Sequence, residues 1–78
     1  MAVNANHRLR QIDSKILDLL EERAMVTADL AEEEEETESA AEIAHWWVEE
    51  ATERGLDDEA SVERVCKAVL LLCKSAER

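Results

Sequence analysis

The 78-residue sequence contains no proline, phenylalanine or tyrosine, and its one glycine is Gly55. Alanine, leucine, glutamate, lysine and arginine dominate instead, and this composition is typical of long helices. Apolar and polar residues alternate over no useful length, so a β-sheet is not expected. We therefore predict one all-α domain that covers residues 1–78.

Long apolar runs and an excess of basic residues are also missing. No segment approaches the roughly 18 apolar residues of a membrane-spanning helix, and residues 1–4 lack the basic start and apolar stretch of a signal peptide. The net charge is −11, from 20 acidic and 9 basic residues, so nucleic-acid phosphates and anionic membranes should repel the chain. We expect a cytoplasmic protein that binds neither, and its acidity fits either a functional surface or adaptation to salt.

The chain has two cysteines, Cys66 and Cys73. On one helix they would lie about 10.5 Å apart along the axis, whereas a disulfide requires Cα atoms within about 7 Å. We therefore expect buried, reduced thiols that do not pair with each other. No histidine or second cysteine pair stands at zinc-ligand spacing, and no calcium-loop pattern is present, so the sequence predicts neither a metal site nor a cofactor.

The first predicted helix runs from about residue 6 to residue 34 and carries a heptad seam. The seam consists of Leu9, Ile12, Ile16, Leu19, Arg23, Val26 and Leu30. Its spacing places these side chains on one face, which Leu20 widens. A helix of about 40 Å is longer than a domain of this size can cover alone, and so small a monomer would bury only about 60% of its unfolded surface. We therefore predict a homodimer.

Two shorter helices are predicted downstream. Ser39 and Glu42 have the spacing of a capping box at the start of the second helix, which should end at Gly55, and Asp57 or Asp58 should cap the third. The predicted buried faces are Ala40, Ile43, Ala44, Trp47 and Ala51 on the second helix, and Val62, Val65, Cys66, Val69, Leu72, Cys73 and Ala76 on the third. The short connections indicate that neighbouring helices run antiparallel.

Consecutive glutamates at positions 32–36 separate the first two helices. Repulsion between like charges disfavours an isolated helix here, although acidic residues near the start of the next helix are favoured by its dipole. The run fits either a solvated turn or a docking surface for a basic protein partner or a cation.

Arg23 occupies a seam position where leucine or isoleucine is expected. A buried charge is costly unless it is paired, which leaves two interpretations. The guanidinium either pairs with an acid on a facing helix and fixes the register, or it points into a pocket and holds an anionic ligand through its bidentate fork.

The sequence around Arg23 resembles a known family. The run from Leu9 to Arg23, LRQIDSKILDLLEER, resembles the first helix of the all-helical (AroQ-type) chorismate mutases, which has an Ile-Asp, a leucine-rich stretch and then Leu-Leu-x-x-Arg. Gly55-Leu56-Asp57, followed by residues 62–65, resembles the start of their third helix. The resemblance implies an intertwined homodimer whose long first helices pack against each other.

The resemblance also implies a reaction, the rearrangement of the dicarboxylate chorismate to prephenate. Catalysis there depends on positioning and on electrostatic stabilisation of a developing ether oxygen, without a protein nucleophile. The family uses an early helix-1 arginine from the partner chain, an arginine at the position of Arg23, a later helix-1 lysine and a helix-2 arginine. A glutamine or glutamate late in helix 3 completes the site.

This chain departs from that pattern at most positions. Arg23 matches, and Glu77 falls near the late glutamine. The early arginine falls on Asn6, although Arg10 lies one turn further on, and the helix-1 lysine falls on Glu34. The helix-2 arginine has no counterpart, because residues 24–53 contain neither lysine nor arginine. Chorismate would meet repulsion at this surface, so ordinary mutase activity is not expected.

The second predicted helix contains His45, Trp46 and Trp47 in succession. Trp47 belongs to the predicted buried face, whereas Trp46 is rotated by about 100° and could lie at an interface or line a pocket. His45 is either a general base that titrates near neutral pH or a solvent-exposed side chain. Lys67 and Lys74 are expected on a solvated face of the third helix.

Three functions fit these patterns. The first is a diverged chorismate-mutase-like homodimer that binds or transforms a small molecule other than chorismate in an interhelical pocket. The second is a non-catalytic dimerisation or regulatory module whose acidic end docks a basic partner. The third is a true mutase with a site rebuilt around Arg10, Arg23 and a cation from another protein. The candidate catalytic residues are Arg23, His45 and Glu77, and the candidate ligand-binding residues are Asn6, Arg10, Arg23 and Trp46.

Overall fold

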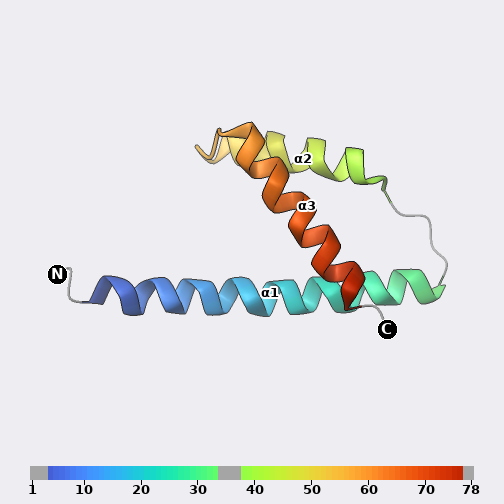
Figure 1. Cartoon of the computed structure of the whole chain (residues 1–78), viewed down its shortest axis with the longest axis horizontal. Coiled ribbons are helices and arrows are strands. Elements are labelled where there is room, and N and C mark those ends of the chain that lie inside the picture. The colour runs from blue at the N-terminus through green and yellow to red at the C-terminus, as the bar shows by residue number, and fades with distance from the viewer. Residues whose placement is uncertain (1–3, 34–37, 77–78) are drawn as a thin grey trace.

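The computed structural model describes residues 4–33 and 38–76, which form three helices and no strand (Figure 1). Helix α1 spans Ala5–Glu33, α2 spans Ala40–Glu53 and α3 spans Glu59–Ser75. The predicted all-α class and the three predicted helices are confirmed. No helix within the described ranges has the length and apolar character needed to cross a membrane.

Helix α2 begins with the predicted capping box. The Glu42 N–H donates to Ser39 Oγ (3.1 Å), and the Ser39 N–H donates to Glu42 Oε1 (2.9 Å). At the other end Gly55 has a φ of 87°, a left-handed conformation that glycine adopts without a Cβ clash. The Leu56 N–H then donates to the Ala51 carbonyl (2.8 Å), which completes a Schellman turn.

Helix α3 is capped by Asp58, one of the two predicted residues. Its Oδ1 accepts from the Ser61 N–H (3.3 Å), and its Oδ2 accepts from the Ser61 hydroxyl (2.9 Å). The turn from Arg54 to Asp58 thereby fixes the direction in which α3 leaves α2.

Helix α3 connects the other two helices in space as well as in sequence. It packs against both α1 and α2, whereas the described parts of α1 and α2 do not pack against each other. In Figure 1, α1 and α2 run in opposite directions but stand apart, and α3 crosses obliquely between them. The antiparallel arrangement is thus only partly realised, and the single chain is not a closed bundle.

The buried core is small and is centred on α3. Among the described residues, Cys66, Val69 and Cys73 are buried, and the two cysteines are 0% and 1% exposed. Both cysteines are free, in agreement with the expectation of buried, reduced thiols. Their shared face of α3 is the surface on which the chain closes.

The rest of the predicted buried surface is only partly covered. On α2, Ile43, Ala44, Trp47 and Ala51 are half-buried and Ala40 is exposed. On α3, Val65 and Leu72 are 53% and 52% exposed and Ala76 is exposed, so their predicted burial is wrong for the single chain. These three side chains border hollows that no other part of the described chain fills.

The dimensions show how open the chain is. Its radius of gyration is 14.9 Å, whereas about 11.5 Å is expected for a compact domain of this length. It exposes 6861 Å², against about 4,800 Å² for a compact monomer of this size. Roughly 2,000 Å² more surface is therefore exposed than a closed single-chain fold would leave.

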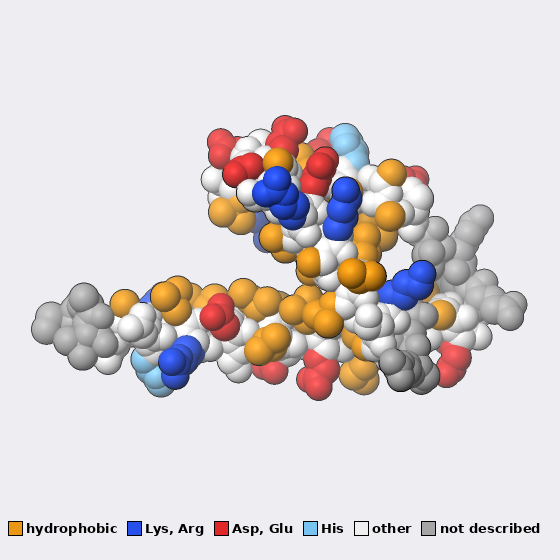
Figure 2. All heavy atoms as spheres, in the orientation of Figure 1, with side chains coloured by type: hydrophobic (Ala, Val, Ile, Leu, Met, Phe, Trp, Pro, Cys, Tyr) orange, Lys and Arg blue, Asp and Glu red, His pale blue; other side chains and the backbone are white. Residues whose placement is uncertain are grey.

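Part of that surface lies on residues 5–19 of α1, here called the α1 arm, and all of these residues are exposed. Leu20, the next residue, is half-buried. Leu9, Ile12, Ile16 and Leu19 of the seam are 43–64% exposed. Figure 2 shows apolar side chains along the edge of α1 that faces the space below α2 and α3. The predicted seam therefore lies on a regular helix, but nothing in the chain covers it.

Candidate functional site

A cavity of about 940 Å³ lies between the three helices and is here called the interhelical cavity. It is lined by Arg23, Thr27 and Leu30 from α1, by Glu38, Ala40, Ile43, Trp46 and Trp47 at and within α2, and by Leu70 and Lys74 from α3. Because α3 packs against both α1 and α2, side chains from all three helices line the same space.

Arg23 reaches the interhelical cavity from the seam of α1. Its side chain is half-buried, and Nη1 lies 3.4 Å from Cys73 Sγ, to which it donates. A thiol is a weak acceptor and carries no compensating charge. Two contacts between basic and acidic side chains occur in the described ranges, His45–Glu49 and Arg54–Glu50, and Arg23 belongs to neither. Within the described chain, the guanidinium therefore retains an uncompensated charge and further donors.

The Arg23 backbone is also held. Thr27 Oγ1 donates to the Arg23 carbonyl oxygen at 2.8 Å, one helical turn along α1. This bond gives the threonine hydroxyl a partner, and Thr27 lines the cavity beside Arg23. Thr27 was not among the sequence candidates, because a threonine in mid-helix usually bonds back to its own helix.

Lys74 supplies a second cation to the lining of the interhelical cavity. It lies one turn beyond Leu70 on α3, and both residues line the cavity. From the sequence Lys74 is expected to be a solvated lysine. Only the crossing of α3 over α1 reveals that its face borders the same space as Arg23. The lining thus holds two cations and one carboxylate, Glu38, in a chain whose net charge is −11.

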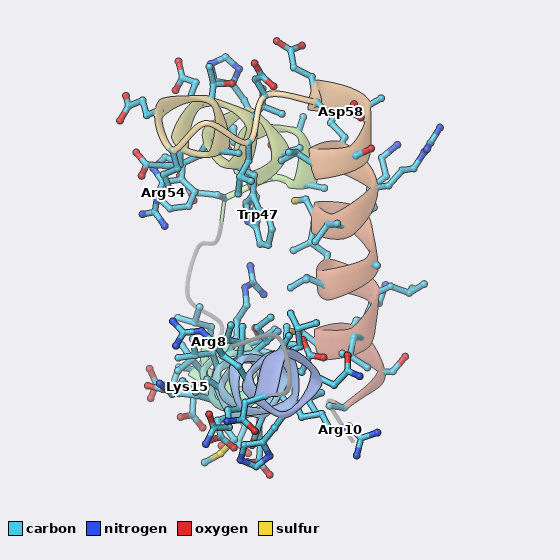
Figure 3. All side chains as sticks on the ribbon, turned by 90° about the vertical axis from the view of Figure 1, so that its left-hand side faces the viewer. Arg8, Arg10, Lys15, Trp47, Arg54 and Asp58 are labelled. Atoms are coloured by element: carbon cyan, nitrogen blue, oxygen red, sulfur yellow. The ribbon has the colours of Figure 1, made fainter. Side chains whose placement is uncertain are left out.

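Two tryptophans form the apolar wall opposite these charges. Trp46 and Trp47 both line the cavity, and Figure 3 shows Trp47 extending from α2 towards α1. Trp46 is 56% exposed, which agrees with the expectation that it turns away from the main buried face. Aromatic faces beside cations can hold a flat or cyclic apolar group while the cations hold an attached anionic group.

The other sequence candidates lie elsewhere. His45 does not line the cavity; its Nε2 lies 3.4 Å from Glu49 Oε2, and its side chain is 75% exposed. Asn6 and Arg10 are on the uncovered α1 arm, and Figure 3 shows Arg10 directed away from α2. Glu77 lies outside the described residues. One chain therefore brings together Arg23 and Trp46 but not His45, Asn6 or Arg10.

Cys66, whose thiol is influenced by Arg23, is not poised as a nucleophile. Burial raises the pKa of the Cys66 thiol, while Arg23 lowers it and Glu63 raises it. A buried thiol whose pKa is raised stays protonated at neutral pH, and the thiolate is the reactive form. The described residues also contain no group of three or more histidine, cysteine or acidic side chains placed to hold a metal ion.

The described lining therefore provides groups that can bind a ligand: two cations, a carboxylate and an aromatic wall. Comparisons with protein-family models, curated proteins and solved structures find no match to this chain. The chorismate-mutase likeness consequently rests on the residues of α1 and of the α2–α3 turn that suggest it.

Proposed function

We propose that this chain is a diverged chorismate-mutase-like subunit that acts as a homodimer and binds a small organic anion other than chorismate in the interhelical cavity. The observation that carries the proposal is the lining of that cavity by Arg23 and Lys74 beside Trp46 and Trp47. Two cations border the space, and the described chain offers Arg23 a thiol in place of a carboxylate. An anion is the partner that this arrangement lacks.

The lining favours one anionic group on a cyclic or aromatic body. Hydrogen bonds to charged groups contribute about 1.5–3 kcal/mol each. We therefore expect the two cations to bind one carboxylate group of the ligand together. Glu38, which also lines the cavity, disfavours a second carboxylate on the ligand. This is the physical reason for proposing a monocarboxylate rather than the dicarboxylate chorismate.

Trp46 and Trp47 provide the readout for a binding test, because they are the only tryptophans in the chain. The probes are cyclohexanecarboxylate, its neutral amide and cyclohexylmethylamine, which have similar shapes and different charges. At about 0.3–0.5 kcal/mol per atom, a ligand of this size should bind in the millimolar range. We expect saturable changes in tryptophan fluorescence with the carboxylate and much weaker ones with the amide or the amine.

Lys74→Ala and Lys67→Ala form a matched pair for the same titration. Both lysines are exposed on α3, but only Lys74 lines the interhelical cavity. Lys74→Ala should weaken carboxylate binding several-fold, and Lys67→Ala should leave it unchanged. Equal effects of the two substitutions, or equal binding of the carboxylate and the amide, would contradict an anion site at this position.

Chorismate belongs in the same titration, with turnover to prephenate followed in parallel. Turnover that depends on Arg10 and Arg23 would support the alternative of a true mutase with a rebuilt site. The proposal expects that chorismate is neither bound nor converted, and that cyclohexanecarboxylate is bound.

The homodimer is the second part of the proposal. It is supported by the exposed seam of the α1 arm and by the roughly 2,000 Å² of surface beyond that of a compact monomer. Stable interfaces bury about 1,200–2,000 Å² in total, so the chain offers enough surface for one. Light scattering coupled to size exclusion should give twice the mass of the chain, and a monomer at high concentration would refute this part.

A further inference from the structure

A second hollow, the corner groove, lies where α2 turns into α3 and has a volume of about 600 Å³. It is lined by Trp46, Trp47, Glu50, Ala51, Arg54, Gly55, Leu56, Asp57, Asp58, Ser61, Val62 and Val65. The two tryptophans also line the interhelical cavity, whereas the remaining lining residues of the two hollows differ. One aromatic wall therefore serves two separate spaces.

The charge of the corner groove is opposite to that of the interhelical cavity. Its lining holds three carboxylates, those of Glu50, Asp57 and Asp58, against the one guanidinium of Arg54, which leaves a charge of −2. Glu50 Oε1 lies 3.4 Å from Arg54 Nη2, and the Asp58 carboxylate caps α3. The Asp57 carboxylate makes neither a hydrogen bond nor an ion pair with the residues that the structure describes. A positively charged ligand is therefore the one that this lining favours.

The rest of the lining decides what kind of cation fits. It is largely apolar, and Trp46, Leu56 and Val65 are 53–64% exposed. In the described ranges no three histidine, cysteine or acidic side chains are placed to hold a metal ion. Indole faces attract ammonium groups, and the aliphatic side chains can cover hydrocarbon. These features favour an organic cation with an apolar body.

The size of the corner groove favours a small molecule over a protein segment. Pockets for small ligands typically have volumes of about 300–1,000 Å³, and this groove falls within that range. A stable protein partner would have to bury about 1,200 Å² or more in total. Within the described ranges α1 makes no packing contact with α2, so the chain does not fill the groove with its own first helix.

We infer that the corner groove is a second ligand site, which binds a small organic diamine. The apolar body of the diamine lies against Trp46, Leu56 and Val65, and its ammonium groups face Asp57 and Glu50. Two positive charges balance the lining charge of −2, whereas a monoamine balances only half of it. This site is distinct from the anion site of the proposed function and does not depend on it.

A fluorescence titration with 1,4-bis(aminomethyl)cyclohexane tests the inference. Cyclohexylmethylamine is the matched probe, because it has the same ring and one ammonium group fewer. The diamine should give a saturable change in tryptophan fluorescence in the millimolar range, and its binding should weaken as salt is added. The monoamine should bind about fivefold more weakly. Equal binding of the two amines, or no binding of the diamine, would overturn the inference.

Asp57→Asn and Glu53→Gln locate the binding site. Both carboxylates are exposed and each substitution removes one negative charge, but only Asp57 lines the corner groove. Asp57→Asn should raise the dissociation constant of the diamine about threefold to fivefold at low salt, and Glu53→Gln should leave it nearly unchanged. Equal effects of the two substitutions would mean that the diamine responds only to the total charge of the chain, and would refute a site at this position.

Lys74→Ala separates this inference from the proposed function. It should weaken the binding of cyclohexanecarboxylate and leave that of the diamine unchanged, and Asp57→Asn should do the reverse. Carboxylate binding without diamine binding would leave the anion site intact and refute the second site. Diamine binding that depends on Asp57, without carboxylate binding, would support the second site and contradict the anion site. If a basic amphipathic peptide changes the tryptophan fluorescence and the diamine does not, the groove belongs to a protein partner and the inference fails.

Discussion

The Arg23 guanidinium donates to the Cys73 sulfur, and this contact bears on the two interpretations left open by the seam. A structural role for this arginine predicts a carboxylate partner, because a buried charge is costly unless it is paired. Instead its observed partner is Cys73, which lies 50 residues away on α3. The heptad pattern identifies Arg23 as exceptional, but no local pattern identifies a partner so distant in sequence.

Arg23→Leu should consequently leave the free energy of unfolding unchanged or raise it by about 1 kcal/mol, because a half-buried charge is replaced by an apolar side chain. The same substitution should abolish cyclohexanecarboxylate binding. Urea unfolding and the fluorescence titration measure the two effects, and Arg23→Lys controls for charge without the planar fork. A clear loss of stability with retained binding would assign Arg23 to the scaffold.

Cys66 gives the fold a pH dependence. Burial raises its pKa, so the folded chain holds the thiol proton more tightly than the unfolded chain, whose thiol titrates near 9.0. This contribution to stability is fully present below about pH 9 and is lost as the pH rises through the folded-state pKa. Wild type should therefore lose more unfolding free energy than Cys66→Ala between about pH 8 and pH 10. Tyrosine cannot contribute, because the chain has none. Parallel losses in the two proteins would mean that the thiol is not responsible.

At the scale of elements, the ends of α2 and α3 follow from a few adjacent residues. The Ser39–Glu42 capping box, the Gly55 turn and the acidic cap of α3 are contacts within three to five positions, so their residue types and spacing could be predicted. The packing of these helices could not. The apolar stripe of α3 predicts burial for Val65 and Leu72, but burial depends on what another element covers, and a stripe does not name its partner.

Gly55→Ala tests the turn between α2 and α3. No atom lies within 4 Å of the position that a Cβ would occupy, so the cost should come from the left-handed backbone alone, about 1 kcal/mol. Gly55→Asn should cost less, because asparagine tolerates this conformation better. Thermal unfolding measures both variants. A much larger loss for alanine would indicate that the turn is covered in the assembled protein.

The residues of the interhelical cavity could likewise be predicted only in part from the sequence. Arg23 and Trp46 could be selected from sequence because each departs from the pattern of its own helix. Lys74 departs from none, since a lysine near the end of a helix is ordinary and complements the helix dipole. Lys74 joins the site only because the end of α3 packs against α1 near Arg23. This proximity is a property of the three-helix arrangement.

At the scale of the whole molecule, the small buried core and the long exposed seam suggest that one chain alone is marginal. Folding should then be coupled to dimerisation, and the midpoint of thermal unfolding should rise with protein concentration. Circular dichroism melts over a hundredfold dilution series would measure this rise. A midpoint independent of concentration would mean that the single chain is stable by itself.

Substitutions in the seam of α1 test whether dimerisation, and with it the coupling to folding, depends on this face of the helix. Ile12 and Ile16 are 43% and 48% exposed in the single chain, so Ile12→Asp/Ile16→Asp should remove few contacts within it. If these side chains lie in an interface, the two carboxylates would be desolvated, and the dimer should dissociate. The control is Gln11→Asp/Ser14→Asp, which adds two carboxylates to the opposite face of the same arm. Both variants gain the same charge on the same helix, so general repulsion and altered helix propensity should affect them similarly. A loss of dimer mass and of the concentration dependence in the seam variant alone would place the partner on the seam, whereas identical behaviour of the two variants would place it elsewhere.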